Sequence, residues 1–281
     1  MTDVINHPTA RSLGAYLTLI RQLSRGPEAS WFRGHIDASW PLRPSIQREF
    51  SEFLQAPEDF YEHERYYASD FQHAASVILA QKPALDDFSG WLTLMQHYGL
   101  PTRLLDWSRS ALFALYFTIV DGAYIDNRAG ETVPVDGAVW LLDPFALNKM
   151  AALEEKTYLY HMQHWTAKGV VQTAFRRNSK SEWERHRDSV VACYATEHDP
   201  RVANQQSVFT VHSSLRSLED IAGEWREAHP ERPLLQKIII PGECKEEIIR
   251  DLYTCGITHR TVFPDLEHVA LDIRRYYGKK R

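Results

Sequence analysis

Residues 96–108, QHYGLPTRLLDWS, contain the densest group of side chains suited to chemistry. His97 could serve as a base, an orienting hydrogen-bond donor or a metal ligand. No second histidine stands at ligand spacing, so we expect no metal site. Asp106 is a natural ion-pair partner for Arg33 or Arg103. Two interpretations stay open: Arg103 and Asp106 brace this loop internally, or the loop forms one wall of a binding site.

A second group lies at residues 31–35, WFRGH, which we expect to form a strand. An arginine inside an aromatic strand is costly to bury unless it has a partner. The forked guanidinium of Arg33 suits a phosphate or carboxylate group. Gly34 allows a ligand or another backbone to approach closely. The competing interpretation, equally open, pairs Arg33 with a buried aspartate.

Two later stretches carry weaker signals. Gln205 and Gln206 are adjacent, and on a strand they would point to opposite faces. An inward-facing amide must find partners, although spacing alone favours an ordinary strand with a surface glutamine. Asp265 is expected to cap the last helix. The glycine-rich nucleotide-binding motifs, the GxSxG hydrolase motif and the HExxH zinc motif are absent.

The elements that must position these residues follow from hydrophobic periodicity and capping signals. We expect a surface loop at 121–136 and a buried apolar helix over 110–120, capped by Asp106 or Ser108. Helices dominate the first half of the chain and strands the second. This predicts an α+β fold in which a helical N-terminal half packs on a mixed or antiparallel sheet. Helices are expected at 9–24, 57–80, 89–98, 110–120, 217–228, 243–253 and 266–277, and strands at 30–35, 137–142, 190–195, 205–212 and 235–240.

Composition is that of a globular protein. The 281 residues are 44% hydrophobic and 25% charged, with a net charge of −5, which excludes a disordered or fibrous chain. Three cysteines in no CxxC pair argue for a reducing compartment. No apolar run is long enough to cross a bilayer, and the N-terminus does not resemble a secretory signal. We therefore expect a cytoplasmic protein with no membrane partner.

The motifs together resemble those of the bacterial FRG-domain family, for which Phe32-Arg33-Gly34 is the namesake. The similarity extends from about residue 30 to about residue 268 and implies a single FRG domain over residues 1–281. Four other stretches also show the similarity: the QHxGLPTRLLDW-like stretch at 96–107, the string Ala114-Leu115-Tyr116-Phe117, the segment Arg201…Gln206-Ser207-Val208-Phe209, and the tail from Ile240-Pro241 to Leu266.

The order of elements is also similar to that of the ADP-ribosyltransferase superfamily. That similarity implies an ADP-ribosyltransferase-like fold and NAD as substrate. It places Arg33 at the first characteristic position, Ser108 or Thr102 at the second, and Gln205 or Gln206 at the third. The catalytic set it implies is Arg33, Ser108, Gln206 and Asp106. The NAD-binding set it implies is Arg33, Gly34, His97, Tyr98, Thr102, Arg103, Trp107 and Tyr116.

One departure from the superfamily pattern is chemically important. Cleavage of the nicotinamide glycosidic bond builds positive charge on the ribose. The superfamily has glutamate at the third position, whereas this chain has glutamine. A neutral amide neither stabilises that charge as a carboxylate does nor acts as a base. Another acid, Asp106, Asp265 or Glu267, would then be required.

Two functional hypotheses follow. The first is an enzyme that uses NAD to modify a macromolecular acceptor, protein or nucleic acid, as a toxin or phage-defence effector restrained by an antitoxin or inhibitor protein. The second is a non-catalytic nucleotide- or protein-binding module in which Arg33 and Asp106 form a structural brace.

Overall fold

The computed structural model describes most of the chain. The described residues are 7–26, 28–49, 57–120, 124–126, 132–151, 160–162, 165–172, 189–194 and 204–278. Most of the region 154–189, which sequence periodicity does not assign, lies outside them, and so does Arg201 of the FRG-like motif.

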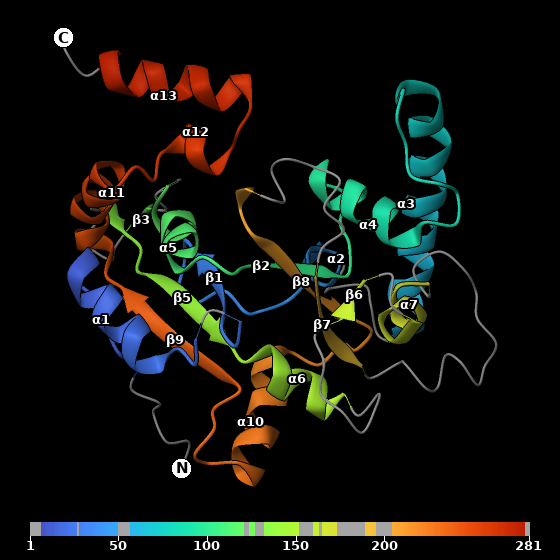
Figure 1. The fold of residues 1–281 in the computed structure, drawn as a ribbon, viewed down its shortest axis with the longest axis horizontal. Coiled ribbons are helices and arrows are strands. Elements are labelled where there is room, and N and C mark those ends of the chain that lie inside the picture. The colour runs from blue at the N-terminus through green and yellow to red at the C-terminus, as the bar shows by residue number, and fades with distance from the viewer. Residues whose placement is uncertain are drawn as a thin grey trace.

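A seven-stranded sheet forms the centre of the molecule (Figure 1). Its strand order is β6-β7-β8-β2-β1-β5-β9. All neighbours are antiparallel except β6 and β7, which are parallel. The predicted α+β class with a mixed sheet is therefore confirmed. The strands are β1 (Trp31–His35), β2 (Leu104–Ser108), β5 (Gly137–Leu142), β6 (Tyr160–His161), β7 (Val190–Tyr194), β8 (Ser207–His212) and β9 (Leu235–Ile240).

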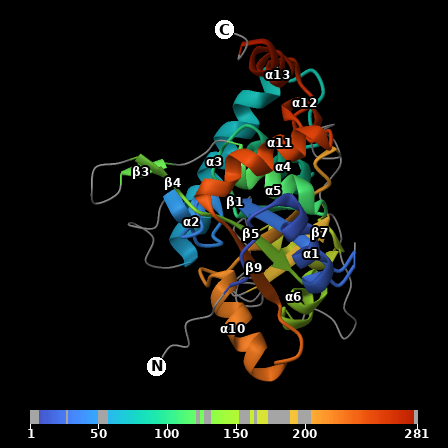
Figure 2. The same cartoon turned by 90° about the vertical axis from the view of Figure 1, so that its left-hand side faces the viewer.

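Helices cover both faces of the sheet and continue to the C-terminus. The prediction that helices belong mainly to the first half was wrong, because six of the helices below follow residue 140. Figure 2 shows α10 and α13 at opposite ends of the molecule. The helices are α1 (Leu13–Leu23), α2 (Ser45–Glu49), α3 (Pro57–Ile78), α4 (Phe88–His97), α5 (Ala111–Ile119), α6 (Pro144–Met150), α7 (Trp165–Gln172), α10 (Leu218–Ala228), α11 (Lys245–Thr254), α12 (His259–Val262) and α13 (Leu266–Gly278).

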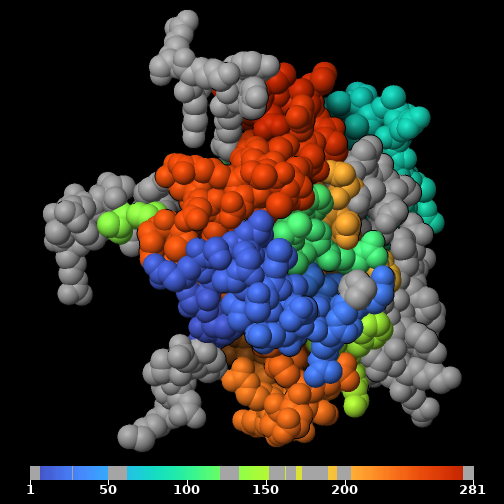
Figure 3. Space-filling model, turned by 60° about the vertical axis from the view of Figure 1, so that its left-hand side comes forward, coloured from blue at the N-terminus to red at the C-terminus, as the bar shows by residue number. Residues whose placement is uncertain are grey.

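Three apolar clusters hold these layers together. One packs α1, α5 and α11 against β1, β5 and β9. Figure 3 shows α1 and α11 side by side on the outside of this cluster. A second, rich in tryptophan, packs α6 and α10 on the opposite face. A third packs α4 and α7 against β2, β7 and β8. Helices α5 and α4 therefore cover different halves of the same sheet face.

Helix α5 approaches the sheet very closely because glycines lie beneath it. A Cβ atom on Gly34 would lie only 2.0 Å from the carbonyl oxygen of Ala114, and one on Gly137 only 2.3 Å from Cγ2 of Thr118. Real Cβ atoms do not occupy such positions. Of the two roles expected for Gly34, close approach of another backbone is thus the one that the contacts explain. The glycine also lies at the edge of the pocket described below.

Several local predictions were wrong. Residues 104–108 form strand β2, which pairs with β8 along its whole length. The cap of α5 is Ser110, whose hydroxyl accepts a hydrogen bond from Phe113 N, so neither Asp106 nor Ser108 caps this helix. Gln205 and Gln206 precede β8 in a turn, and Gln206 has φ of +49°. Their side chains therefore do not alternate across a strand.

The predicted loop at 121–136 contains a small antiparallel pair, β3 (Tyr124–Asp126) and β4 (Thr132–Pro134). A short 3-10 turn, η1 (Gly242–Cys244), precedes α11, which therefore begins later than expected. The bounds of β1, α4, α5, β5, α10 and β9 agree with the sequence to within one residue. Asp265 caps α13 as predicted, since its carboxylate accepts a hydrogen bond from His268 N.

Candidate functional site

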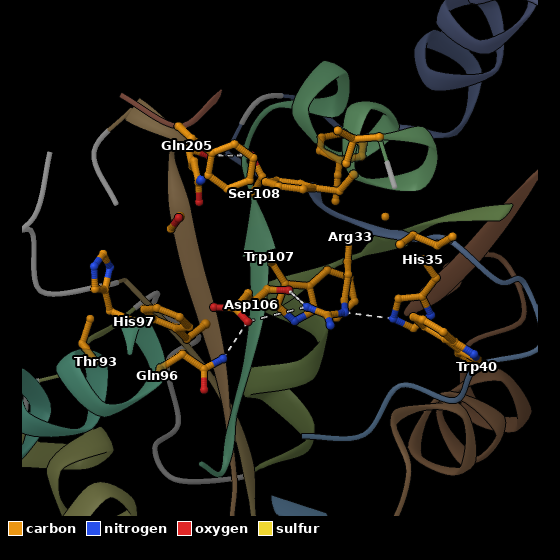
Figure 4. A pocket seen from close by; sticks show the side chains of 18 of the residues that line it. Arg33, His35, Trp40, Thr93, Gln96, His97, Asp106, Trp107, Ser108 and Gln205 are labelled. Atoms are coloured by element: carbon orange, nitrogen blue, oxygen red, sulfur yellow. Dashed lines mark hydrogen bonds and ion pairs between the residues drawn. The ribbon is translucent and has the colours of Figure 1, made fainter. Parts of the chain in front are cut away.

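A pocket opens where the neighbouring strands β1 and β2 move apart from each other. They are in register only at Phe32 and Ser108, so their remaining residues diverge. The pocket has a volume of about 360 Å³, within the usual range for small-molecule sites. Figure 4 shows it between helices α4 and α5, which cover different halves of one sheet face. It is lined by Phe32, Arg33, Gly34, His35, Ile36, Trp40, Arg48, Thr93, Gln96, His97, Asp106, Trp107, Ser108, Phe117, Val120, Gln205, Ser207, Phe209 and Phe263.

The side chain of Arg33 spans the gap between the two strands. Its Nη1 donates to the backbone carbonyl of Asp106 at 2.6 Å, a group that a continuous β1–β2 ladder would otherwise engage. Its Nε donates to Nε2 of His35 at 2.9 Å. A buried carbonyl needs such a partner. Arg33 therefore has a structural role as well as a place in the pocket.

The charge of Arg33 is only partly compensated. The nearest carboxylate oxygen, Oδ2 of Asp106, lies 3.8 Å from Nη1, beyond hydrogen-bond distance. Within the described part of the chain, Nη2 of Arg33 has no hydrogen-bond partner. Burial and, to a smaller extent, the charge of Arg48 lower the pKa of Arg33 to about 10, while Asp106 opposes the change. The guanidinium stays charged at neutral pH and has a free donor for an anion.

His35 is the neutral partner of this guanidinium. The ring is 4% exposed, and burial together with the charge of Arg33 lowers the pKa of His35 to about 3. His212 is fully buried, and the same two causes lower its pKa to about 3. Both rings are therefore uncharged in the folded protein at neutral pH.

These two histidines predict a loss of stability in acid. In the unfolded chain both should titrate near 6.5, so below that pH the unfolded state binds more protons. Stability is complete above about pH 6.5 and falls as the pH drops towards 3. At pH 5 each histidine should cost roughly 2 kcal/mol.

Urea denaturation at pH 7 and pH 5 measures this effect. The variant His35→Gln has no titrating ring there and should lose roughly 2 kcal/mol less between the two pH values than the wild type. Equal losses in the two proteins would contradict the assignment.

The carboxylate of Asp106 is oriented by α4. Gln96 Nε2 donates to Asp106 Oδ2 at 2.7 Å. Thr102 donates its hydroxyl hydrogen to Oε1 of Gln96, which directs the amide hydrogens of Gln96 towards the carboxylate. This Thr102–Gln96–Asp106 chain gives three of the polar residues in 96–108 a common structural role. Thr102 itself is fully buried and does not line the pocket.

Arg103 is a structural residue. Its side chain is 0% exposed and forms an ion pair with the equally buried Glu64 of α3. Its backbone N–H donates to Glu64 Oε1 at 2.9 Å, and its Nη1 donates to the carbonyl of Val170 at 3.0 Å. The implied contact of Arg103 with NAD is therefore corrected. The alternative of an Arg103–Asp106 brace is also wrong, because Arg103 pairs with Glu64 while the Asp106 carboxylate accepts a hydrogen bond from Gln96.

Ser108 links β2 to the turn before β8. Its hydroxyl donates to the carbonyl of Gln205 at 2.7 Å and accepts from Ser110 N at 2.9 Å. Gln205 Nε2 donates to the carbonyl of Val262 at 3.1 Å, which ties the turn to α12. Of the two glutamines that the resemblance leaves open for the third position, only Gln205 lines the pocket, whereas the exposed Gln206, which the implied catalytic set contains, does not.

The ring-bearing residues of the implied NAD-binding set lie in three places: the pocket, the surface and the core. Trp107 and His97 line the pocket. Tyr98 is 62% exposed but lies outside it and contacts Phe71 and His97. Tyr116 is fully buried, with its hydroxyl 2.7 Å from Nδ1 of His259. Neither Tyr98 nor Tyr116 lines the pocket, so the structure does not support the contact with NAD that the resemblance implies for them.

Sequence reasoning missed four residues of functional or structural weight: Trp40, Arg48, Gln96 and Glu64. Gln96 belonged to the stretch singled out, but nothing local showed that its amide would contact Asp106. Trp40 and Arg48 stand in a region without a recognisable motif. Glu64 is one of many acids on α3, and only the fold shows that it is buried.

The described residues show no cluster of three or more His, Cys, Asp or Glu side chains arranged to hold a metal ion. Among these same residues, no helix is both long and apolar enough to span a bilayer.

The fold and pocket thus define an α+β protein with a mixed sheet and a positively charged hollow at its centre. The family model of the FRG domain matches residues 28–126. This match includes β1, α4, β2 and α5, and it supports the FRG assignment made from the motifs. No curated protein and no solved structure matches the chain.

Proposed function

We propose that this protein is an ADP-ribosyltransferase-like enzyme that uses NAD to modify a macromolecule. One observation carries the proposal. Arg33, Ser108 and Gln205, which the resemblance offers for the three characteristic positions, come from β1, the end of β2 and the turn before β8, and all three line one pocket. These strands are neighbours in the order β8-β2-β1.

The reaction would break the bond between ribose C1′ and nicotinamide N1. The bonding electrons leave with nicotinamide, and a nucleophile of the acceptor forms a new bond to C1′ and releases a proton. Arg33 would bind the diphosphate, because its Nη2 is free and its charge is only partly compensated. Holding NAD in this way lowers the entropic cost of reaction.

Positive charge that develops on the ribose needs a nearby negative group. Asp106 supplies the carboxylate among the described residues of the pocket. Asp265 and Glu267, the other acids considered, do not line it. The carboxylate of Asp265 instead interacts with His268 at 2.7 Å. We therefore assign charge stabilisation to Asp106 and orientation of the ribose to Gln205.

Replacing Gln205 with glutamate should increase turnover. The variant Gln205→Glu brings a second carboxylate to the pocket, and we expect nicotinamide release from NAD to rise about tenfold, since one well-placed electrostatic contact contributes at least this much. The measurement is nicotinamide release by the purified protein, together with transfer of labelled ADP-ribose to proteins and RNA of a bacterial extract.

Gln206→Glu is the matched control, because it makes the same chemical change one residue away on an exposed side chain. It should leave turnover unchanged. Equal effects of the two variants, or none of either, would contradict the role given to Gln205. Absence of NAD consumption by wild type and Gln205→Glu in the presence of extract would contradict the enzymatic proposal itself.

The second candidate is a non-catalytic nucleotide- or protein-binding module. The internal hydrogen bonds of Arg33 to His35 and to the Asp106 carbonyl favour it, because two of the three guanidinium nitrogens serve the fold. Ligand binding to the native state raises the melting temperature by mass action. A rise with NAD but no turnover would favour nucleotide binding without catalysis. The macromolecular acceptor, a toxin or phage-defence role and an inhibitor partner are predictions from the resemblance, and a cytoplasmic location is a prediction from the composition.

A further inference from the structure

Trp40 is unusual among the aromatic residues of the pocket. Phe32, Trp107 and Phe209 are almost completely buried in the apolar clusters, whereas Trp40 is 44% exposed. A large aromatic surface left in contact with water is unfavourable. An exposed ring at the edge of a pocket is therefore a natural place for a ligand ring to stack.

The loop that carries Trp40 is held firmly. Lys245 Nζ donates to the carbonyl of Ile36 at 2.7 Å, and Lys237 Nζ donates to the carbonyl of Ala38 at 2.5 Å. Both the backbone N–H and the hydroxyl of Ser39 donate to Oδ1 of Asp37 at 2.7 Å. A ring on such a loop loses little conformational entropy when it binds a partner.

The charges beside Trp40 indicate what kind of ring would bind. The ring lies 6.2 Å from His35, which in turn accepts a hydrogen bond from Arg33. Arg48 also lines the pocket and is close enough to Arg33 to lower its pKa. Guanidinium groups beside an aromatic platform suit a molecule that joins an anionic group to a flat ring, as a nucleotide does.

The position of Trp40 selects one half of a dinucleotide. In Figure 4, Gln205 and Trp40 lie on opposite sides of the pocket and Arg33 lies between them. Under the proposed function, on which this inference rests, Gln205 faces the ribose next to nicotinamide. We propose that Trp40 is the stacking platform for the adenine ring of NAD, with the diphosphate on Arg33.

Calorimetric titration with three probes tests this inference. ADP-ribose contains the adenine ring and the diphosphate, inorganic pyrophosphate contains the diphosphate alone, and nicotinamide mononucleotide lacks adenine. For Trp40→Leu we expect affinity for ADP-ribose to fall about tenfold or more, as loss of one base-stacking contact does. Affinity for the other two probes should stay within about twofold. Trp40→Phe should restore part of the loss.

Tyr98→Leu is the matched control, because it removes an exposed aromatic ring that lies outside the pocket. It should bind ADP-ribose like the wild type. Pyrophosphate binding with equal ADP-ribose affinity in wild type and Trp40→Leu would overturn the stacking role and leave the diphosphate contact of the proposed function intact. A wild type that binds none of the three probes would overturn both.

Discussion

Replacing Arg33 with alanine is expected to weaken the binding of NAD and ADP-ribose by roughly a hundredfold, as loss of one member of a buried charge pair does. Arg33 places its charged guanidinium in the pocket. Its Nη2 has no hydrogen-bond partner among the described residues and can therefore donate to a ligand. Titration calorimetry of the purified variant measures the loss. Arg11→Ala is the control, because Arg11 is an exposed arginine whose ion pair with Glu243 lies outside the pocket.

Arg33→Lys separates ligand binding from bracing. Lysine keeps a positive charge but lacks the planar fork that reaches both His35 and the Asp106 carbonyl. If Arg33 binds the diphosphate, Arg33→Lys should retain more affinity than Arg33→Ala. If Arg33 is only a brace, both variants should melt at lower temperature, and millimolar NAD should not shift the melting temperature of the wild type. This last result would contradict the proposed function.

Breaking the buried Arg103–Glu64 pair is expected to give the largest loss of stability. Both side chains are 0% exposed. Removing Arg103 leaves the buried carboxylate of Glu64 without this ion pair, and neutralising Glu64 removes the same pair from Arg103, so Arg103→Met and Glu64→Gln should each lower the free energy of unfolding by about 3–5 kcal/mol. Urea denaturation at neutral pH measures the change.

The double variant Arg103→Met/Glu64→Leu should recover much of this loss, because no unpaired charge then remains. The exposed pair of Arg250 and Glu246 on α11 is the control. Arg250→Ala should cost less than about 1 kcal/mol. If Arg103→Met also lost less than about 1 kcal/mol, the buried pair would not have the large effect on stability that its burial predicts.

Elements with strong local signals were predictable from sequence. Helix α10 begins at Ser217, whose hydroxyl accepts from Asp220 N while the Asp220 carboxylate accepts from Ser217 N. Helix α4 ends before Gly99, which has φ of +81°. Such caps depend on residues a few positions apart. Strand β2 has no comparable signal, because its partner β8 lies about a hundred residues away in sequence.

The sequence predicted many of the residues of the candidate site, but it did not predict which of them contact one another. The sequence singled out Arg33, His97, Asp106 and Ser108, and all four line the pocket. The implied catalytic set contained Gln206, but Gln205 is the glutamine that lines the pocket, because a turn rather than a strand holds both residues.

By itself, the sequence determined the α+β class, most element boundaries and the segments in which polar chemistry is concentrated, because periodicity, capping and composition are local properties. The tertiary structure decided which of these side chains meet. Arg103 pairs with Glu64 in the interior, while Arg33 spans the opening between β1 and β2. The physical reason is that burial and pairing depend on strand register and on the packing of distant helices, which bring together groups that no short stretch of chain can specify.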